Sequence, residues 1–151
     1  MVQAVKDNAA PLRIGVIGVG IMGSNHARVL MGLPGVQLVG VVDPDRGQRE
    51  MVTRVAGCAG FTTLEEMFKA GVDAVTIAAP THLHHNIALE CIGRGIHVLV
   101  EKPIALTLDE ADQVLRAIEK TGADVRVGYS RRYKERYLIA KEQIAQARMG
   151  T

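Results

Sequence analysis

The chain has 151 residues, which is enough for one ordinary domain and too few for two large ones. Hydrophobic residues make up 48% and charged residues 23%, so the composition indicates a packed core and excludes a disordered chain. Aromatic residues make up only 3%, and there is no Trp, which argues against stacking-based binding of single-stranded nucleic acid.

The formal net charge of +2 is unevenly distributed along the chain. Residues 131–151 contain six basic and two acidic side chains, a local charge of +4, so residues 1–130 carry −2. This C-terminal stretch is either a solvated basic helix or an arm that binds DNA. The first interpretation is favoured because charged runs are usually solvated faces. We therefore expect no nucleic-acid partner.

Cys58 and Cys91 are the two cysteines, and their spacing fits no metal site. Two such thiols are typical of a reduced, cytoplasmic protein. The N-terminus lacks the charged-then-apolar pattern of a secretion signal, and no apolar run reaches ~18 residues. We expect a cytoplasmic protein with no membrane partner.

After a polar lead-in over residues 1–11, strand and helix patterns alternate along the chain. Short apolar, β-branched runs predict buried strands at 12–18, 36–43, 58–61, 73–79, 97–100 and 125–129, of which 58–61 is the weakest. Helices are predicted at 21–32, 44–56, from the Thr63–Glu66 capping box onward, at 83–94, from the Thr107–Glu110 capping box to 121, and at 131–148.

This alternation predicts the fold class. Strands that alternate with helices pair in parallel through right-handed crossovers. Strands that are apolar throughout fit a sheet covered on both faces. The prediction is an α/β fold, a doubly wound parallel sheet (Rossmann fold) of about six strands in the order 3-2-1-4-5-6, over residues 12–130.

The sequence GVGIMG places Gly18, Gly20 and Gly23 in G-x-G-x-x-G spacing, after a predicted strand and at the start of a predicted helix. In that context the first glycine permits a tight turn, the second admits a diphosphate, and the third lets helix and strand pack closely. The N–H groups at the helix start, at Ile21 and Met22, then point toward the phosphates. The alternative is a glycine-rich turn without a ligand.

Asp43 ends the second predicted strand, twenty residues after Gly23. A carboxylate there accepts hydrogen bonds from ribose hydroxyls and repels a 2′-phosphate, which favours NAD over NADP. NADP remains an alternative because Arg46 follows closely and could reach a 2′-phosphate. A second interpretation of Asp43, as the N-cap of a helix beginning at Pro44, is compatible with the first.

The fourth predicted strand is followed by the sequence PTHLHHN. In open parallel sheets the ligand lies beyond the carboxyl ends of the strands, so Pro80 and Thr81 are expected to border the cofactor. His82, His84 and His85 together suggest zinc, but one helical turn cannot direct all three at one ion, and no fourth ligand is evident. We expect no metal.

The fifth predicted strand, HVLV, is followed directly by Glu101, Lys102 and Pro103. A lysine at the carboxyl edge of the sheet points into the same cleft as the glycine turn. There it can hold a substrate hydroxyl or a developing alkoxide and so favour hydride transfer. Glu101 can fix the lysine or bind on the nicotinamide side, and Pro103 locks the turn, with a cis bond as one option. The alternative is a surface ion pair at a strand end.

Together these motifs resemble the cofactor-binding half of the Gfo/Idh/MocA oxidoreductases. The matching sequences, in order and spacing, are RIGVIGVGIMGSNHARVL, VVDPD, AAPTHLHHNIALECIGRGIHVLVEKPIA and VGYSRRY. The resemblance covers residues about 12–151, and the EKP triplet is its most specific signal.

The resemblance implies that Lys102 contacts both the nicotinamide ribose and the substrate as the catalytic residue. It places His84 beside the cofactor and Arg131 where the family often has a polar residue near the nicotinamide. Taken with the motifs, the expected cofactor-binding residues are Gly18, Gly20, Ile21, Met22, Gly23, Asp43, Pro80, Thr81, His84, Glu101, Lys102, Pro103 and Arg131.

Members of this family are longer than this chain. Their second domain carries the substrate pocket, most of the subunit interface, and an aspartate and histidine, of which the histidine transfers the proton. The resemblance therefore implies a truncated chain. Residues 131–151 would begin the crossover to a missing substrate and oligomerisation domain of a homo-oligomeric parent.

The expected parent transfers hydride between a secondary hydroxyl of a sugar, inositol or sugar derivative and a nicotinamide dinucleotide, NAD or NADP. The chain alone should bind cofactor without turnover. One alternative is a non-catalytic dinucleotide-binding sensor or partner module, against which Lys102 argues. A nucleic-acid-binding protein that uses the basic C-terminal stretch ranks last.

Overall fold

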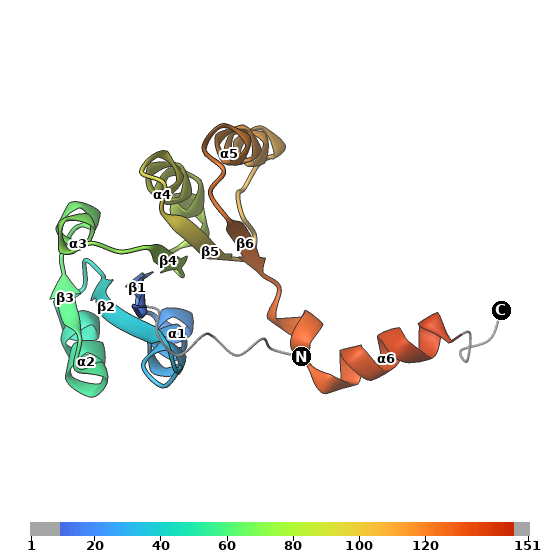
Figure 1. Ribbon diagram of the computed structural model, residues 1–151, viewed down its shortest axis with the longest axis horizontal. Helices are drawn as coiled ribbons and strands as arrows, with labels where there is room; N and C mark the ends of the chain where they lie inside the picture. The colour runs from blue at the N-terminus through green and yellow to red at the C-terminus, as the bar shows by residue number, and fades with distance from the viewer. Residues whose placement is uncertain (1–9, 147–151) are drawn as a thin grey trace.

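The computed structural model describes residues 10–146, which contain one six-stranded sheet (Figure 1). Every pair of neighbouring strands is parallel. The order is β3-β2-β1-β4-β5-β6, which confirms the predicted fold class and order. The strands are β1 (Leu12–Ile17), β2 (Val36–Val42), β3 (Ala59–Phe61), β4 (Ala74–Ile77), β5 (His97–Glu101) and β6 (Val125–Gly128). Of the predicted lead-in over residues 1–11, residues 1–9 lie outside the described part.

The helices lie between these strands, as the alternation of patterns predicts. Both predicted capping boxes are present, and in each the threonine hydroxyl accepts the N–H of the glutamate three residues later. The helices are α1 (Ile21–Leu30), α2 (Arg46–Ala56), α3 (Leu64–Ala70), α4 (Thr81–Gly93), α5 (Leu108–Thr121) and α6 (Glu135–Ala145), with a 3₁₀ turn η1 (Ser130–Tyr133).

Two helices begin elsewhere than the sequence predicts. Helix α2 begins at Arg46 rather than at Pro44, because Asp45 is its N-cap and accepts the N–H of Gln48 at 2.9 Å. The interpretation of Asp43 as the cap was therefore wrong. Helix α4 begins two residues earlier than predicted, directly after a proline whose fixed φ suits a helix start.

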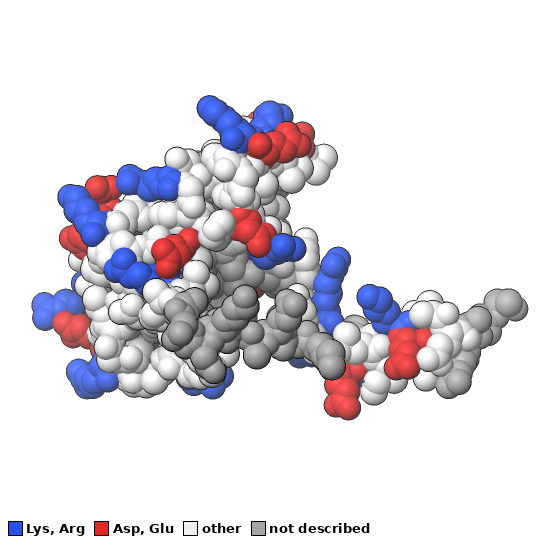
Figure 2. All heavy atoms as spheres, viewed as in Figure 1, with Lys and Arg blue, Asp and Glu red and all other residues white. Residues whose placement is uncertain are grey.

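The predicted helix over 131–148 is divided into two elements. The 3₁₀ turn η1 and the helix α6 are separated at Lys134, whose ψ of 131° is extended. Helix α6 packs mainly against η1 and extends away from the sheet (Figure 1). Residues 147 and 148 lie outside the described part of the chain. Blue and red side chains both appear on this projecting segment (Figure 2), so its basic residues are interspersed with acidic ones.

Different helices cover the two faces of the sheet, because the order of strands reverses after β3. Helices α1 and α2 lie on one face, and α3, α4 and α5 on the other (Figure 1). A small cluster under α1 and α2 includes Val16, Val41 and Val52. A larger cluster on the other face includes Ile92 and Val114. The reversal brings the ends of β1 and β4 together, which is where such sheets bind ligands.

In the described part of the chain, no helix is both long enough and apolar enough to cross a membrane.

Candidate functional site

The turn after β1 crosses closely over the end of β4. Gly18 adopts a φ of +83°, and its N–H donates to the Val42 carbonyl at 2.8 Å. A Cβ atom on Gly18 would lie 2.6 Å from the backbone nitrogen of Ala79. Both the positive φ and the close approach require glycine at this position.

Gly23 and Gly20 lack side chains for different reasons. A Cβ atom on Gly23 would lie 1.7 Å from the carbonyl oxygen of Gly18, so this glycine lets α1 pack on the turn. A Cβ atom on Gly20 would approach nothing closer than Gln48 Oε1, at 4.0 Å. Packing within the protein therefore does not require glycine at position 20, and the space above it is open to a ligand.

The start of α1, like that of α4, has no side-chain cap. Side chains of Asp45, Thr63 and Thr107 cap α2, α3 and α5. The N-cap of α1 is Gly20, which has no side chain to offer. N–H groups of the first turn thus remain available at the positive end of the helix dipole. This environment fits the diphosphate of a dinucleotide, which needs N–H donors and close access to the backbone.

These features border a cleft of about 700 Å³ at the carboxyl end of the sheet. Six predicted residues line it: Gly18, Gly20, Ile21, Met22, Asp43 and Pro80. Sequence reasoning missed the rest of the wall, which includes Pro44, Asp45, Gln48, Thr62, Thr63, Leu64, Ala78, Ala79, Leu83 and Ile87. The sequence did contain a signal for two of these residues, because Leu83 and Ile87 are an i, i+4 apolar pair on the helix that follows β4.

Asp43 lies at the end of β2 with only 8% of its surface exposed. Its Oδ2 accepts the N–H of Val19 at 2.8 Å, and its Oδ1 accepts the N–H of Asp45 at 2.8 Å. Each carboxylate oxygen can accept a second hydrogen bond. The residue therefore holds the glycine turn and the start of α2 together and keeps acceptor capacity toward the cleft.

Arg46 is the residue that made NADP an alternative to NAD in the sequence-based prediction. Its side chain is directed along its own helix, α2. Its Nε donates to Glu50 Oε1 at 2.7 Å, one helical turn further on, and its side chain is 82% exposed. This hydrogen bond raises the pKa of Arg46 and lowers the pKa of Glu50. The guanidinium thus has a partner on the outside of α2.

Glu101, Lys102 and Pro103, here called the Lys102 turn, follow β5 and do not contribute to the wall of the 700 Å³ cleft. Lys102 and Pro103 are exposed, and the peptide bond between them is cis, the option left open from the sequence. Glu101 is partly buried, and its Oε1 lies 2.9 Å from Nε2 of His26 on α1. His26 had no role in the sequence-based prediction.

The three neighbouring histidines of α4 have different environments. His82 is exposed, and His85 Nδ1 lies 3.1 Å from Oδ1 of Asn86. His84 is 1% exposed, with Nδ1 2.8 Å from the Pro103 carbonyl oxygen and Nε2 2.8 Å from the Ala79 carbonyl oxygen. Its ring lies behind the cleft rather than in its wall. Within residues 10–146, no group of three His, Cys, Asp or Glu side chains is arranged to hold a metal ion.

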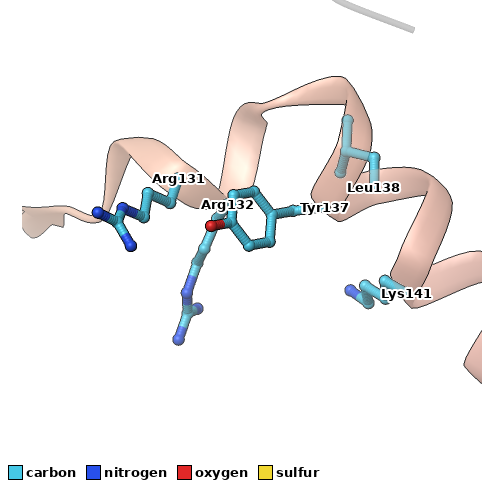
Figure 3. Close-up of a pocket in the computed structure, with 5 residues that line it drawn as sticks. All are labelled: Arg131, Arg132, Tyr137, Leu138 and Lys141. Atoms are coloured by element: carbon cyan, nitrogen blue, oxygen red, sulfur yellow. The ribbon is translucent and has the colours of Figure 1, made fainter.

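The two remaining predicted residues, Thr81 and Arg131, do not line the 700 Å³ cleft. Thr81 is the first residue of α4 and is partly buried. Arg131 belongs to η1 and lines a separate hollow of about 390 Å³ with Arg132, Tyr137, Leu138 and Lys141. In Figure 3 the Arg131 side chain extends away from Tyr137 and Lys141. The structure therefore does not bring Arg131 into the wall of the 700 Å³ cleft.

The comparisons with known proteins agree with this geometry. The Gfo/Idh/MocA model, described as an oxidoreductase family with an NAD-binding Rossmann fold, matches residues 12–129. The scyllo-inositol 2-dehydrogenase (NAD(+)) of Bacillus subtilis (strain 168) is 34% identical over 142 residues, covering 92% of this chain and 42% of that protein. The glucose-6-phosphate 3-dehydrogenase of the same strain is 30% identical over 138 residues, covering 91% of this chain and 39% of that protein.

The crystal structure of myo-inositol 2-dehydrogenase from Lactobacillus plantarum superposes with a TM-score of 0.88 at 31% identity, over 93% of this chain and 43% of that one. The chain therefore spans less than half the length of these relatives. The six-stranded parallel sheet, the glycine turn over an open helix start and the match over residues 12–129 lead to one conclusion: the chain belongs to the Gfo/Idh/MocA oxidoreductase family and comprises its NAD-binding Rossmann domain.

Proposed function

We propose that the chain binds NAD in the 700 Å³ cleft, with the diphosphate over the start of α1. The observation that carries this proposal is the contrast between the glycines: Gly23 is required by packing, whereas Gly20 leaves space that no protein atom fills. The Asp43 carboxylate accepts hydrogen bonds from the hydroxyls of the adenine-side ribose, and its negative charge disfavours a 2′-phosphate.

The walls of the cleft suit the remainder of the dinucleotide. Ile21, Leu64, Leu83 and Ile87 supply apolar surface from three different helices. Dinucleotide sites combine such apolar walls with a few polar groups that fix orientation. Lys102, which follows β5, would hold the nicotinamide end of the dinucleotide by donating a hydrogen bond to the nicotinamide ribose.

The full protein transfers hydride between a secondary hydroxyl of a sugar, inositol or sugar derivative and NAD. When bound, NAD supplies the hydride acceptor. The Lys102 ammonium donates to the reacting hydroxyl oxygen and stabilises the negative charge that develops there. Relatives named as inositol 2-dehydrogenases and as a glucose-6-phosphate 3-dehydrogenase support this substrate class.

The 151-residue chain alone binds the cofactor and does not turn over. Lys102 is exposed, so water is not excluded from the position where a substrate would react. Calorimetry with NADH should give a measurable dissociation constant, while oxidation of myo-inositol by the same preparation stays undetectable. Robust turnover would contradict this part of the proposal.

The decisive test compares NADH with ADP, which lacks both the nicotinamide and its ribose. Lys102→Ala should weaken NADH binding about fivefold, the loss of one hydrogen bond to the nicotinamide ribose, and leave ADP binding unchanged. Lys120→Ala, which removes an exposed lysine at the end of α5, is the matched control and should change neither affinity. Equal NADH affinity in the Lys102→Ala and unmodified chains would contradict the role given to Lys102.

A further inference from the structure

The Glu101 carboxylate is held from the α1 side of the sheet. Its side chain is only 12% exposed, and His26 Nε2 lies 2.9 Å from its Oε1. A carboxylate accepts hydrogen bonds and a partly buried one needs a donor, so His26 Nε2–H donates to Glu101. This bond joins α1, directly after the glycine turn, to the residue before Lys102 across 75 positions of sequence.

The residue after Lys102 is held from the other side. The ring of His84 on α4 is fully enclosed, and its nitrogens face the carbonyl oxygens of Pro103 and Ala79, each at 2.8 Å. Carbonyl oxygens only accept, so whichever ring nitrogen carries the hydrogen donates to the carbonyl oxygen that faces it. His84 thus connects the segment after β4 to the segment after β5.

Helices α1 and α4 lie on opposite faces of the sheet, so the two contacts approach the Lys102 turn from opposite directions (Figure 1). We propose that His26 and His84 are positioning residues, which fix the backbone on both sides of Lys102 and thereby direct its amine toward the nicotinamide side of the cleft. This inference rests on the proposed function of Lys102.

The physical reason for two such contacts lies in the lysine itself. Lys102 is exposed and carries its ammonium group on a flexible four-carbon stem. A fixed backbone limits the volume that the amine explores. Displacements of about 1 Å in a reacting group can cost about 100-fold in rate. Rigid attachment of Glu101 and Pro103 therefore affects binding at the nicotinamide end of the cofactor and not at the adenine end.

The test uses the 151-residue chain and the ratio of NADH to ADP affinity. His26→Leu and His84→Leu each remove a donor while filling space, and each should weaken NADH binding about threefold to fivefold without weakening ADP binding. His26→Gln keeps a donor that reaches Glu101 and should restore NADH affinity. His82→Gln, an exposed neighbour on α4, is the matched control and should change nothing.

A merely structural role predicts another pattern, in which NADH and ADP affinities fall together, and that result would overturn the proposal. If His84→Leu does not fold, His26→Leu and its rescue by His26→Gln decide the question. A selective effect of Lys102→Ala without any effect of His26→Leu overturns the positioning role alone. No effect of Lys102→Ala overturns the proposed function, and the positioning role with it.

Discussion

The carboxylate of Asp43 accepts a hydrogen bond from the backbone N–H of Val19 at 2.8 Å, across 24 positions of sequence. This bond ties the end of β2 to the glycine turn that follows β1. The other carboxylate oxygen accepts the N–H of Asp45 at the start of α2. The residue proposed to select the cofactor ribose is therefore also part of the framework that shapes the cleft.

Asp43→Asn should affect both stability and cofactor choice. The amide has one acceptor oxygen where the carboxylate has two. One of the two N–H groups that the Asp43 carboxylate accepts therefore loses its partner, at a cost of about 1–3 kcal/mol in the free energy of unfolding. NADH affinity should fall about tenfold and preference over NADPH should shrink, because the repelling charge is gone. Urea denaturation and calorimetry measure the two effects, with exposed Asp112→Asn as control. Unchanged NADH affinity and preference would refute the assignment.

Gly20→Ala and Gly23→Ala form a matched pair. The new methyl of Gly23→Ala would lie 1.7 Å from the Gly18 carbonyl oxygen, so α1 must move, at a cost of about 1–3 kcal/mol or more in stability. The methyl of Gly20→Ala meets nothing within the protein closer than 4.0 Å, so stability should stay within about 0.5 kcal/mol while NADH affinity falls. Thermal unfolding and fluorescence titration separate the two. Full NADH affinity in a folded Gly20→Ala chain would mean that the diphosphate lies elsewhere.

Cys91 should be unreactive while the chain is folded. Burial raises the pKa of its thiol from 9.0 to about 12, and burial also raises the pKa of the half-buried Cys58. Because only the thiolate is nucleophilic, iodoacetamide at pH 8 should modify Cys58 slowly and Cys91 only through unfolding. Mass spectrometry of the alkylated chain reads out both sites. Equal rates of Cys91 alkylation in native buffer and in denaturant would contradict the burial of this thiol.

The same shift predicts how stability responds to alkaline pH. Below about pH 9 the Cys91 thiol is neutral in both the folded and unfolded chain, so its contribution is complete. As pH rises from 9.0 toward about 12, the unfolded thiol ionises first and its contribution to the free energy of unfolding declines. Cys91→Ala should show a shallower decline over this interval than the unmodified chain in urea denaturation. Equal declines in the free energy of unfolding of the two chains would contradict the raised pKa of Cys91.

Thr107→Ala should lower stability without changing cofactor binding. The Thr107 hydroxyl accepts the N–H of Glu110 in the capping box of α5, which lies away from the cleft wall. Loss of the cap costs about 1 kcal/mol. Thr63→Ala removes the equivalent cap of α3 at a residue that lines the cleft and should lower both stability and NADH affinity. Equal effects of the two variants on NADH affinity would contradict this distinction.

Local signals were sufficient to predict the fold. The capping boxes at Thr63 and Thr107, the apolar strands and the glycine turn each depend on residues close together in sequence, and all are present. Ambiguity arose where two residues could serve equally: Asp43 and Asp45 both flank a proline, and only the structure shows which of them caps α2. The separation of η1 from α6 at Lys134 could not be predicted, because no glycine or proline lies at this position in the sequence.

The site was less predictable because its contacts join distant segments. Nothing near His84 in the sequence indicates that its ring is buried against Pro103, since that contact depends on how α4 packs beside the segment after β5. His26 is likewise an ordinary helical residue until α1 places it against Glu101. Strand-end logic predicted a cleft at the edge of the sheet where the structure has one, but it could not separate the residues that line this cleft from those that lie outside its wall.

The most direct test of the central claim is an amide-resolved NMR titration of the 151-residue chain with NADH. The account predicts that the largest shift changes fall on Gly18, Gly20 and their neighbours at the start of α1, with further changes at Asp43 and Leu83. Changes confined to the hollow around Arg131 and Lys141, with the glycine turn unaffected, would contradict it.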